Sequence, residues 1–330
     1  MLSIHHLDER GLQRASVDPA IFFVASKLDP SLLWVDLLEP TAEEEALIEQ
    51  QFHVAVPTRE EMREIETSNR LYEEDGVLFL TATVVTQLDT DHPQNNPITF
   101  ILTRDVLITN RYVDPLPFQR YATFAARHPE QCRSPGAILA GLLEAFVNRI
   151  ADALERTSDE MDHLTAEVFT PIDSKRNQRV RDYRQILERV GRSGDLNSKA
   201  RETLTSLGRL LAFLQQSNHK QIDETTRIRF RTIFRDLRQM SDHAAFLAGK
   251  VQFTLDATLG MINIEQNNTL KIFSVVTVLL LPPSVIGAAY GMNLRYLPGA
   301  EHPFGFSLAV LLMILSAIVP FMVFRRRGWL

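Results

Sequence analysis

The chain has 330 residues, enough for two domains, and its 45% hydrophobic and 23% charged content is that of an ordinary soluble protein. Its net charge of −6 argues against a nucleic-acid-binding protein, which normally carries a basic face. The single cysteine, Cys132, excludes an internal disulfide framework and favours a reducing compartment. Residues 1–10 lack the apolar core of a signal peptide, so membrane entry is expected at the C-terminal end.

Residues 1–134 have the pattern of a mixed α/β domain. Thr41 followed by Glu44 predicts the N-cap and capping box of a helix, and a second, acidic helix is expected from about Thr58. The turn at residues 74–76 leads into a β-rich run, and Arg104-Asp105 predicts a hairpin. The expected strands are residues 21–24, 33–37, 77–85, 98–103 and 106–111.

From Pro135 the apolar residues recur with helical spacing. Helix breaks are expected at Thr170-Pro171, at residues 191–195 and at residues 217–219. After the last break, one apolar stripe continues to Lys271. A continuous helix from about Asp223 to Asn293 would be on the order of 100 Å long. A compact domain cannot hold such a helix, so it is expected to associate with other helices or other copies of the chain.

Two membrane segments follow, Ile272–Tyr290 and Phe304–Phe324. Each has the roughly 20 residues that span a bilayer and contains no Asp, Glu, Lys or Arg. Basic residues flank the hairpin at Lys271 and at residues 325–327, so the positive-inside rule predicts that both termini are cytoplasmic. The expected segments are a cytoplasmic α/β domain (1–134), a helical hairpin region (135–221), a stalk helix (222–271), two membrane helices (272–293 and 304–324) with an external loop (294–303) between them, and a basic cytoplasmic tail (325–330).

One hairpin of two apolar helices cannot enclose an aqueous path, so conduction requires a homo-oligomer. The first membrane helix carries the polar residues and is the better lining helix. Helical steps back from Asn293 give a face of hydroxyls, amides and apolar constrictions, which is typical of a gated pore. Whether each hydroxyl faces the pore or bonds its own helix backbone is left open. The predicted pore-lining residues are Asn267, Leu270, Thr277, Leu281 and Ser284, with Ser274 or Phe273 and Leu280 as neighbouring choices, and Pro282-Pro283 is expected to bend the helix.

Tyr290-Gly-Met-Asn293 at the end of the first segment resembles the signature of the CorA family of divalent-cation channels. The stretches Gly260–Asn268, Lys271–Val276 and Leu281–Ser284 and the tail from Arg325 are similar to enterobacterial-type CorA magnesium transporters. The resemblance implies a funnel-shaped homopentamer in the inner membrane, driven by the membrane potential. It also implies an α+β cytoplasmic domain, an α/β/α sandwich, on a helical stalk. The selectivity residues it implies are Gly291, Met292 and Asn293, and the inner pore asparagine is Asn267.

In some members of the family, acidic residues between neighbouring cytoplasmic domains bind Mg²⁺ and hold the gate shut. The candidates for such a regulatory metal site are Asp236 and Asp242 on the stalk and Asp89 and Asp91 in a polar loop. The alternative is that they form ordinary solvated surfaces.

The external loop departs from magnesium-transporting relatives, which usually continue with Met-Pro-Glu-Leu. Here the matching residues are Leu297–Ala300, and Arg295 stands where an earlier acid is common. This loop should concentrate cations only weakly. The departure admits a zinc, cobalt or nickel transporter of the same fold. Glu301 and His302 are candidate metal ligands at the entrance, with a solvated turn as the alternative.

Three functions remain in competition: a Mg²⁺ channel that also passes Co²⁺ or Ni²⁺, a Zn²⁺ uptake or efflux transporter, and a non-conducting membrane scaffold. The sequence contains no Gly-rich phosphate loop and no set of nucleophile, base and orienting group, so neither an ATP-driven pump nor an enzyme is expected. No cofactor is expected besides the transported cation. The expected partners are other copies of the chain, the lipid bilayer and divalent cations.

Overall fold

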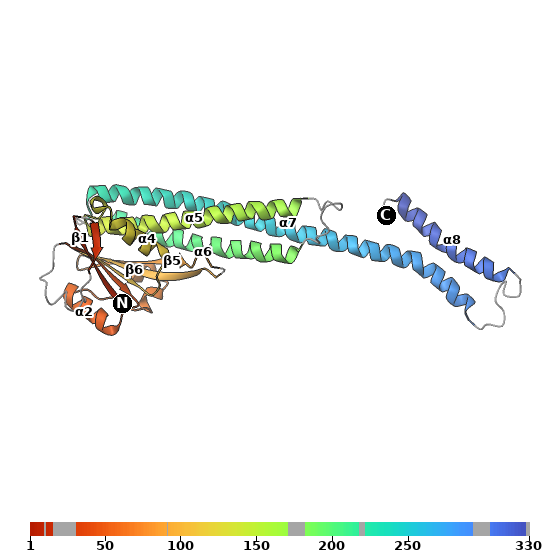
Figure 1. The fold of residues 1–330 in the computed structure, drawn as a ribbon, viewed down its shortest axis with the longest axis horizontal. Coiled ribbons are helices and arrows are strands. Elements are labelled where there is room, and N and C mark those ends of the chain that lie inside the picture. The colour runs from red at the N-terminus through yellow and green to blue at the C-terminus, as the bar shows by residue number, and fades with distance from the viewer. Residues whose placement is uncertain are drawn as a thin grey trace. The chain divides into compact units, whose positions relative to one another are not determined.

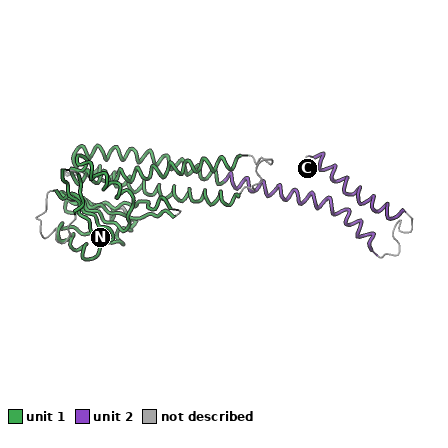
Figure 2. The backbone as a smooth tube through the Cα atoms, in the orientation of Figure 1, with its two compact units in different colours: residues 1–255 green, residues 256–330 purple. Residues whose placement is uncertain are grey.

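The structure is a computed structural model that describes residues 1–9, 11–15, 31–90, 92–170, 182–217, 222–292 and 304–327. The chain divides into two compact units, Met1–Leu255 and Asp256–Leu330 (Figure 2). Helix α7 (Glu224–Tyr290) contributes to both units. The strand expected at residues 21–24 lies outside the described residues.

The first unit is built on one mixed sheet with the strand order β2-β1-β3-β7-β6-β5-β4. Among the described strands, β3 and β7 form the parallel pair, with Trp34 opposite Leu107, and the other pairs are antiparallel. The strands are β1 (Leu2–Asp8), β2 (Gly11–Arg14), β3 (Leu32–Leu38), β4 (Leu71–Glu74), β5 (Val77–Thr86), β6 (Gln94–Leu102) and β7 (Leu107–Arg111).

Local sequence signals account for several of these elements. The capping box of α2 (Ala42–Phe52) is confirmed: the Glu44 amide donates to Thr41 Oγ1 at 3.2 Å, and the Thr41 amide donates to Glu44 Oε2 at 3.0 Å. Asp75 and Gly76 have φ of 50° and 78°, as the tight turn between β4 and β5 requires. The hairpin of β6 and β7 is also confirmed, with Leu102 opposite Leu107.

Helices cover both faces of the sheet, because alternate residues of a strand point to opposite sides (Figure 1). On β5, Leu78 and Leu80 join the core formed with the helices α4 to α7, whereas Phe79 joins the core on the side of α2. The α/β/α sandwich is therefore confirmed. The helices on the larger side are α4 (Leu116–Ala125), α5 (Pro135–Phe169), α6 (Tyr183–Gln216) and the first part of α7.

The break expected at residues 191–195 is wrong, because α6 continues through this stretch. A Cβ added at Gly194 would lie 3.2 Å from Val251 Cγ1, which is closer than an ordinary contact. Gly194 therefore serves close packing of α6 on α7 rather than a turn. A Cβ at Gly191 meets nothing within 4 Å, so this glycine is simply tolerated in the helix.

The acidic helix expected from about Thr58 is also wrong. The structure has a single 3-10 turn, η1 (Glu61–Arg63), and then a short helix, α3 (Thr67–Arg70), with Glu64 between them at ψ 144°. Thr58 and Glu61 hydrogen-bond each other's backbone amides, which stabilises the first turn only. No apolar stripe extends that turn, since Met62 is buried but Ile65 is 92% exposed.

Candidate functional site

Among the described residues, the helices long and apolar enough to cross a membrane are the end of α7 and α8 (Gly305–Arg326), and both belong to the second unit. Their described side chains are mostly exposed to the surroundings, as expected where lipid or other helices replace a protein core. Helix α7 continues through Pro282 and Pro283, which cannot donate to the carbonyls four residues earlier. Figure 1 shows α7 curving along its C-terminal stretch.

One side of α7 packs against α8. Val275 is 4% exposed, and a Cβ at Gly287 would lie 3.0 Å from Met313 Cε of α8. Leu279, Ile286 and Tyr290 are half-buried and fall within about 60° of Val275 around the helix, at about 100° per residue. Helix α8 therefore covers a defined side of α7.

The predicted pore residues lie on the other side. Leu270, Thr277, Leu281 and Ser284 are all exposed and cluster about 180° from the centre of the covered side. Asn267 is exposed too, but lies about 70° from the centre of this group. The structure thus places four of the five predicted residues on one free face, which we call the polar face, with Asn267 at its margin.

The hydroxyls of the polar face bond their own helix. Thr277 Oγ1 donates to the Phe273 carbonyl at 2.8 Å, and Ser284 Oγ donates to the Leu280 carbonyl at 2.7 Å. Ser274, beside them, does the same to Leu270. Each hydroxyl has one hydrogen and two lone pairs, so the bond to the backbone uses the hydrogen and leaves the oxygen as an acceptor. A surface of acceptors is suited to hydrated cations.

The signature motif lies at the end of α7. The Gly291 amide donates to the Gly287 carbonyl at 2.9 Å, and the Met292 amide donates to the Ala289 carbonyl at 3.4 Å. A Cβ at Gly291 would come within 3.2 Å of the Gly287 oxygen, so a larger residue would crowd this last turn. Asn293 follows directly and, with the external loop, lies outside the described residues; so do the entrance candidates Glu301 and His302.

The predicted regulatory acids have different surroundings. Asp89 accepts hydrogen bonds from Arg149 and, at 3.1 Å, from Arg156 Nη1. The hydrogen bond from Arg149, more than any other contact, holds the pKa of Asp89 below its ordinary value. Asp242 is exposed and Asp236 half-exposed. Within the described part of the chain no three acidic, His or Cys residues gather as a metal site, and Asp91 lies outside it.

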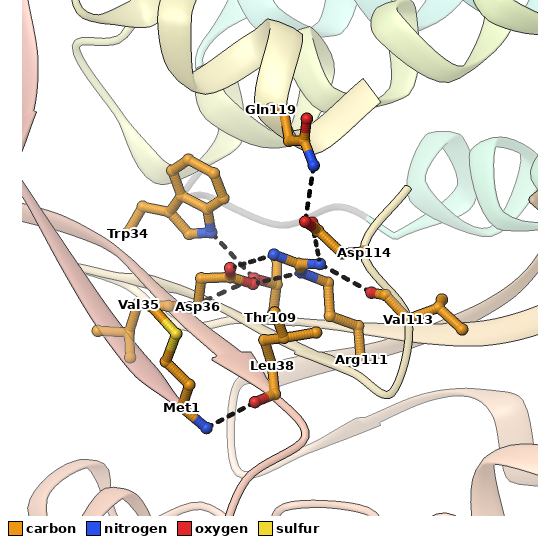
Figure 3. A network of polar contacts seen from close by, with 10 residues as sticks. All are labelled: Met1, Trp34, Val35, Asp36, Leu38, Thr109, Arg111, Val113, Asp114 and Gln119. Carbon is orange, nitrogen blue, oxygen red and sulfur yellow. Dashed lines mark hydrogen bonds and ion pairs between the residues drawn. The ribbon is translucent and has the colours of Figure 1, made fainter. Parts of the chain in front are cut away.

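Sequence reasoning missed a buried ion-pair network at the ends of the parallel strands β3 and β7 (Figure 3). Arg111 donates to both oxygens of Asp36, at 3.0 and 2.8 Å, and to Asp114 at 2.8 Å. Although burial opposes its charge, Asp36 keeps the pKa of Arg111 above its ordinary value. Thr109 also donates to Asp36, at 2.7 Å, and accepts from the Trp34 indole. An aspartate within the apolar run 33–37 is the signal that could have predicted a buried partner.

The sheet with its long helices and the two candidate membrane helices define a membrane protein with a large domain outside the bilayer. A family model described as "CorA-like Mg2+ transporter protein" matches residues 29–326, so the chain belongs to this family and is a divalent-cation transporter of the CorA type. The resemblance drawn from the signature is therefore confirmed. Because the family consists of ion transporters, the expectation that the chain is not an enzyme is confirmed as well.

Individual relatives agree with this assignment. The chain is 28% identical to the magnesium transport protein CorA of Escherichia coli (strain K12), over the full length of both chains. The complete structure of the CorA magnesium transporter from Methanocaldococcus jannaschii is similar in fold, with 20% identity, a TM-score of 0.77 and coverage of 100% of this chain and 99% of that one. The ZntB cytoplasmic domain from Vibrio parahaemolyticus RIMD 2210633 is also similar, with 11% identity and a TM-score of 0.58 over 79% of this chain and 97% of that one.

Proposed function

We propose that the chain forms a homopentameric pore that passes Mg²⁺, and also Co²⁺ and Ni²⁺, across the inner membrane down the electrochemical gradient. The observation that carries the proposal is the polar face: an exposed, hydroxyl-bearing side of α7 directly opposite the side covered by α8. The magnesium transport assigned by name to the Escherichia coli relative, similar over its whole length, supports the choice of ion.

The free surface of α7 favours assembly of several copies. A single hairpin cannot shield a cation from lipid, so the polar faces of several subunits must surround the path. Upstream on the same helix, Phe246 is 65%, Phe253 55% and Ile264 55% exposed, at spacings that keep them on one side. At Gly249 and Gly260 on that side, an added Cβ would meet nothing within 4 Å. An apolar stripe with such gaps is suited to packing against a helix of a neighbouring copy.

The chemistry of the path follows from the slow dehydration of magnesium. Mg²⁺ keeps several of its waters and demands near-octahedral geometry. Thr277 and Ser284 offer acceptor oxygens to those waters, while Leu270 and Leu281 provide apolar constrictions where a gate can close. At the outer end, a ring of Asn293 carboxamides accepts hydrogen bonds from the hydrated ion without the tight binding of a carboxylate ring.

Charge distribution sets the orientation of the hairpin and the driving force. Lys271 precedes the first membrane segment and Arg325–Arg327 follow the second, so we place both ends of the hairpin, and both termini, in the cytoplasm. A membrane potential that is negative inside then drives a divalent cation inward with about 4.6 kcal/mol per 100 mV, twice the value for a single charge.

Metal regulation of the gate remains part of the proposal, with Asp236 and Asp242 of the stalk as the preferred acids. Asp89 is the weaker candidate because both of its oxygens are engaged by arginine. If stalk acids bind Mg²⁺ between subunits, D236N/D242N should need a higher Mg²⁺ concentration than the wild type for the same protection against trypsin. D89N should need the same concentration as the wild type. Equal protection of the wild type and D236N/D242N would remove the stalk acids from regulation.

A zinc transporter of the same fold is the second candidate function. It is favoured by the external loop, in which Leu297–Ala300 carry no acid and Arg295 adds a positive charge. Such a loop gives little electrostatic advantage to a strongly hydrated ion. In this alternative, Glu301 and His302 would be ligands at the entrance, because imidazole suits Zn²⁺.

Flux into liposomes with an ion-sensitive dye inside separates the candidates. The purified protein is expected to admit Mg²⁺, and Asn293→Ala should abolish that flux. Asn268→Ala, about 170° around α7 from the centre of the polar face, serves as the matched control and should conduct as the wild type does. Zn²⁺ flux with little Mg²⁺ flux would replace the first candidate with the second. No divalent flux from an intact oligomer would leave only the scaffold.

A further inference from the structure

Four cations lie at one level of the second unit. The contact between Gly287 and Met313 fixes how α8 runs back along α7 (Figure 2). From that contact, Lys271 lies about 24 Å along α7 and Arg326 about 20 Å along α8, at 1.5 Å per residue. These two distances differ by less than the rise of one helical turn, about 5.4 Å. Lys271, Arg325, Arg326 and Arg327 therefore form one group, which we call the basic belt.

The basic belt has no counterion within the described part of the chain. No described carboxylate forms an ion pair with any of its four members. Arginines of the first unit differ: Arg111, Arg189 and Arg229 each bind a carboxylate. From Gln266 to Met292 and from Phe304 to Arg327, all charged residues are the members of the belt. In the part of the chain that the structure describes, these four cations thus concentrate positive charge without a paired carboxylate.

Exposed apolar side chains lie next to these cations. Ile272 is 65% and Phe273 66% exposed beside Lys271, and Phe321 is 42% and Val323 45% exposed before the arginines. This order of apolar and then cationic residues matches the boundary between acyl chains and headgroups, where Lys and Arg extend their charge toward the polar side. A guanidinium binds phosphate with two parallel hydrogen bonds. Successive arginines on a helix point about 100° apart, so they reach more than one headgroup.

We propose that the basic belt binds the phosphate groups of anionic lipid headgroups and so holds the membrane hairpin at a fixed depth. The inference rests on the membrane placement in the proposed function, but not on which ion is transported. A protein that conducts no divalent cation would still bind these lipids, so failure of the flux experiment and failure of this one are distinguishable.

The test uses the full-length protein in a neutral detergent, with its thermal unfolding followed as lipid is added. Phosphatidylglycerol is expected to raise the unfolding temperature, while equal amounts of phosphatidylcholine and of inorganic phosphate leave it unchanged. The shift should shrink as salt is added, because the contact is electrostatic and exposed. An equal shift with inorganic phosphate would mean that the basic belt binds free anions rather than lipid headgroups, and it would overturn the proposal.

Two variants isolate the belt. R325Q/R326Q/R327Q is expected to need roughly ten to a hundred times more phosphatidylglycerol than the wild type for the same shift in unfolding temperature. This estimate uses the usual contribution of a basic residue at an anionic surface. R63Q/R104Q/R133Q removes the same charge from exposed positions of the first unit and should keep the wild-type response. Native mass spectrometry of the wild type, which needs no variant, should show phosphatidylglycerol retained over phosphatidylcholine. No such enrichment, or an unchanged response in the belt variant, would overturn the proposal.

Discussion

Arg111 stabilises the end of the parallel strand pair by neutralising a carboxylate that is almost fully buried. Asp36 is 5% exposed and receives two of the hydrogen bonds of Arg111. Arg111→Ala would leave that charge buried and unpaired, so we expect a loss of about 3–5 kcal/mol in the free energy of unfolding. Chemical denaturation followed by tryptophan fluorescence measures it, since Trp34 lies in the same network.

Arg104→Ala is the control for this change, because Arg104 is exposed at the β6–β7 turn. Its unfolding free energy should stay within about 0.5 kcal/mol of the wild type. If Arg111→Ala cost no more than Arg104→Ala, the network would not stabilise the fold.

The ion pair of Asp89 predicts a dependence of stability on pH. Its pKa is lowered in the folded chain, chiefly by the hydrogen bond from Arg149, so its stabilisation is present above the ordinary value of 3.8 and is lost as the pH falls through the lower folded value. The carboxylate is 63% exposed, so the gain stays below about 1 kcal/mol. Unfolding of the wild type and D89N should differ slightly at pH 7 and converge below pH 3.8. A gap that widens in acid would contradict this origin.

At the scale of elements, two of the three glycines of α6, Gly191 and Gly194, make a matched pair. Gly191→Ala adds a methyl group where nothing lies within 4 Å, so it should raise the free energy of unfolding by up to about 1 kcal/mol through helix propensity. Gly194→Ala places the same methyl 3.2 Å from Val251 and should gain less or lose stability, and Gly194→Leu should clearly destabilise. Thermal unfolding of the three variants is the measurement. A gain at both positions would mean that α6 and α7 are not closely packed there.

These elements also show what the sequence could predict. The Thr41–Glu44 capping box and the β6–β7 hairpin are local signals and are confirmed, because residues a few positions apart determine them. The break at Gly194 was predicted wrongly because this glycine allows close packing against Val251, which is nearly sixty positions away in the sequence. The strands β1 and β2 were missed although they are neighbours in sequence and pair with each other, and helix α4 was missed as well.

The candidate site also combines features that local sequence predicts with features that depend on distant contacts. Helical spacing alone grouped Leu270, Thr277, Leu281 and Ser284, because period is a property of sequence. The side of α7 that α8 covers depends on how Met313 packs against Gly287. Helical spacing in the sequence does not reveal this contact. The ion pairs of Asp89 and of Asp36 likewise join residues 60 or more positions apart and could only be found in the folded chain.

For the whole molecule, the family and the fold define a divalent-cation transporter. Its proposed conduction path depends on one geometrical feature, the polar faces of several α7 helices surrounding the path. The chain offers a favourable background for testing it. Cys132 is fully buried, and burial raises the pKa of its thiol, so it should not react with a polar thiol reagent. Cysteines introduced on α7 can therefore be labelled selectively.

The most direct measurement is Mg²⁺ flux into liposomes before and after treatment of Thr277→Cys and Val275→Cys with a cationic methanethiosulfonate. Thr277 lies on the polar face, whereas Val275 is 4% exposed on the side of α8. Labelling of Thr277→Cys is expected to reduce the Mg²⁺ flux severalfold, because a fixed positive charge repels the cation in a narrow path. Treated Val275→Cys should conduct as before. Block at position 275 with none at position 277 would show that the opposite face of α7 lines the path.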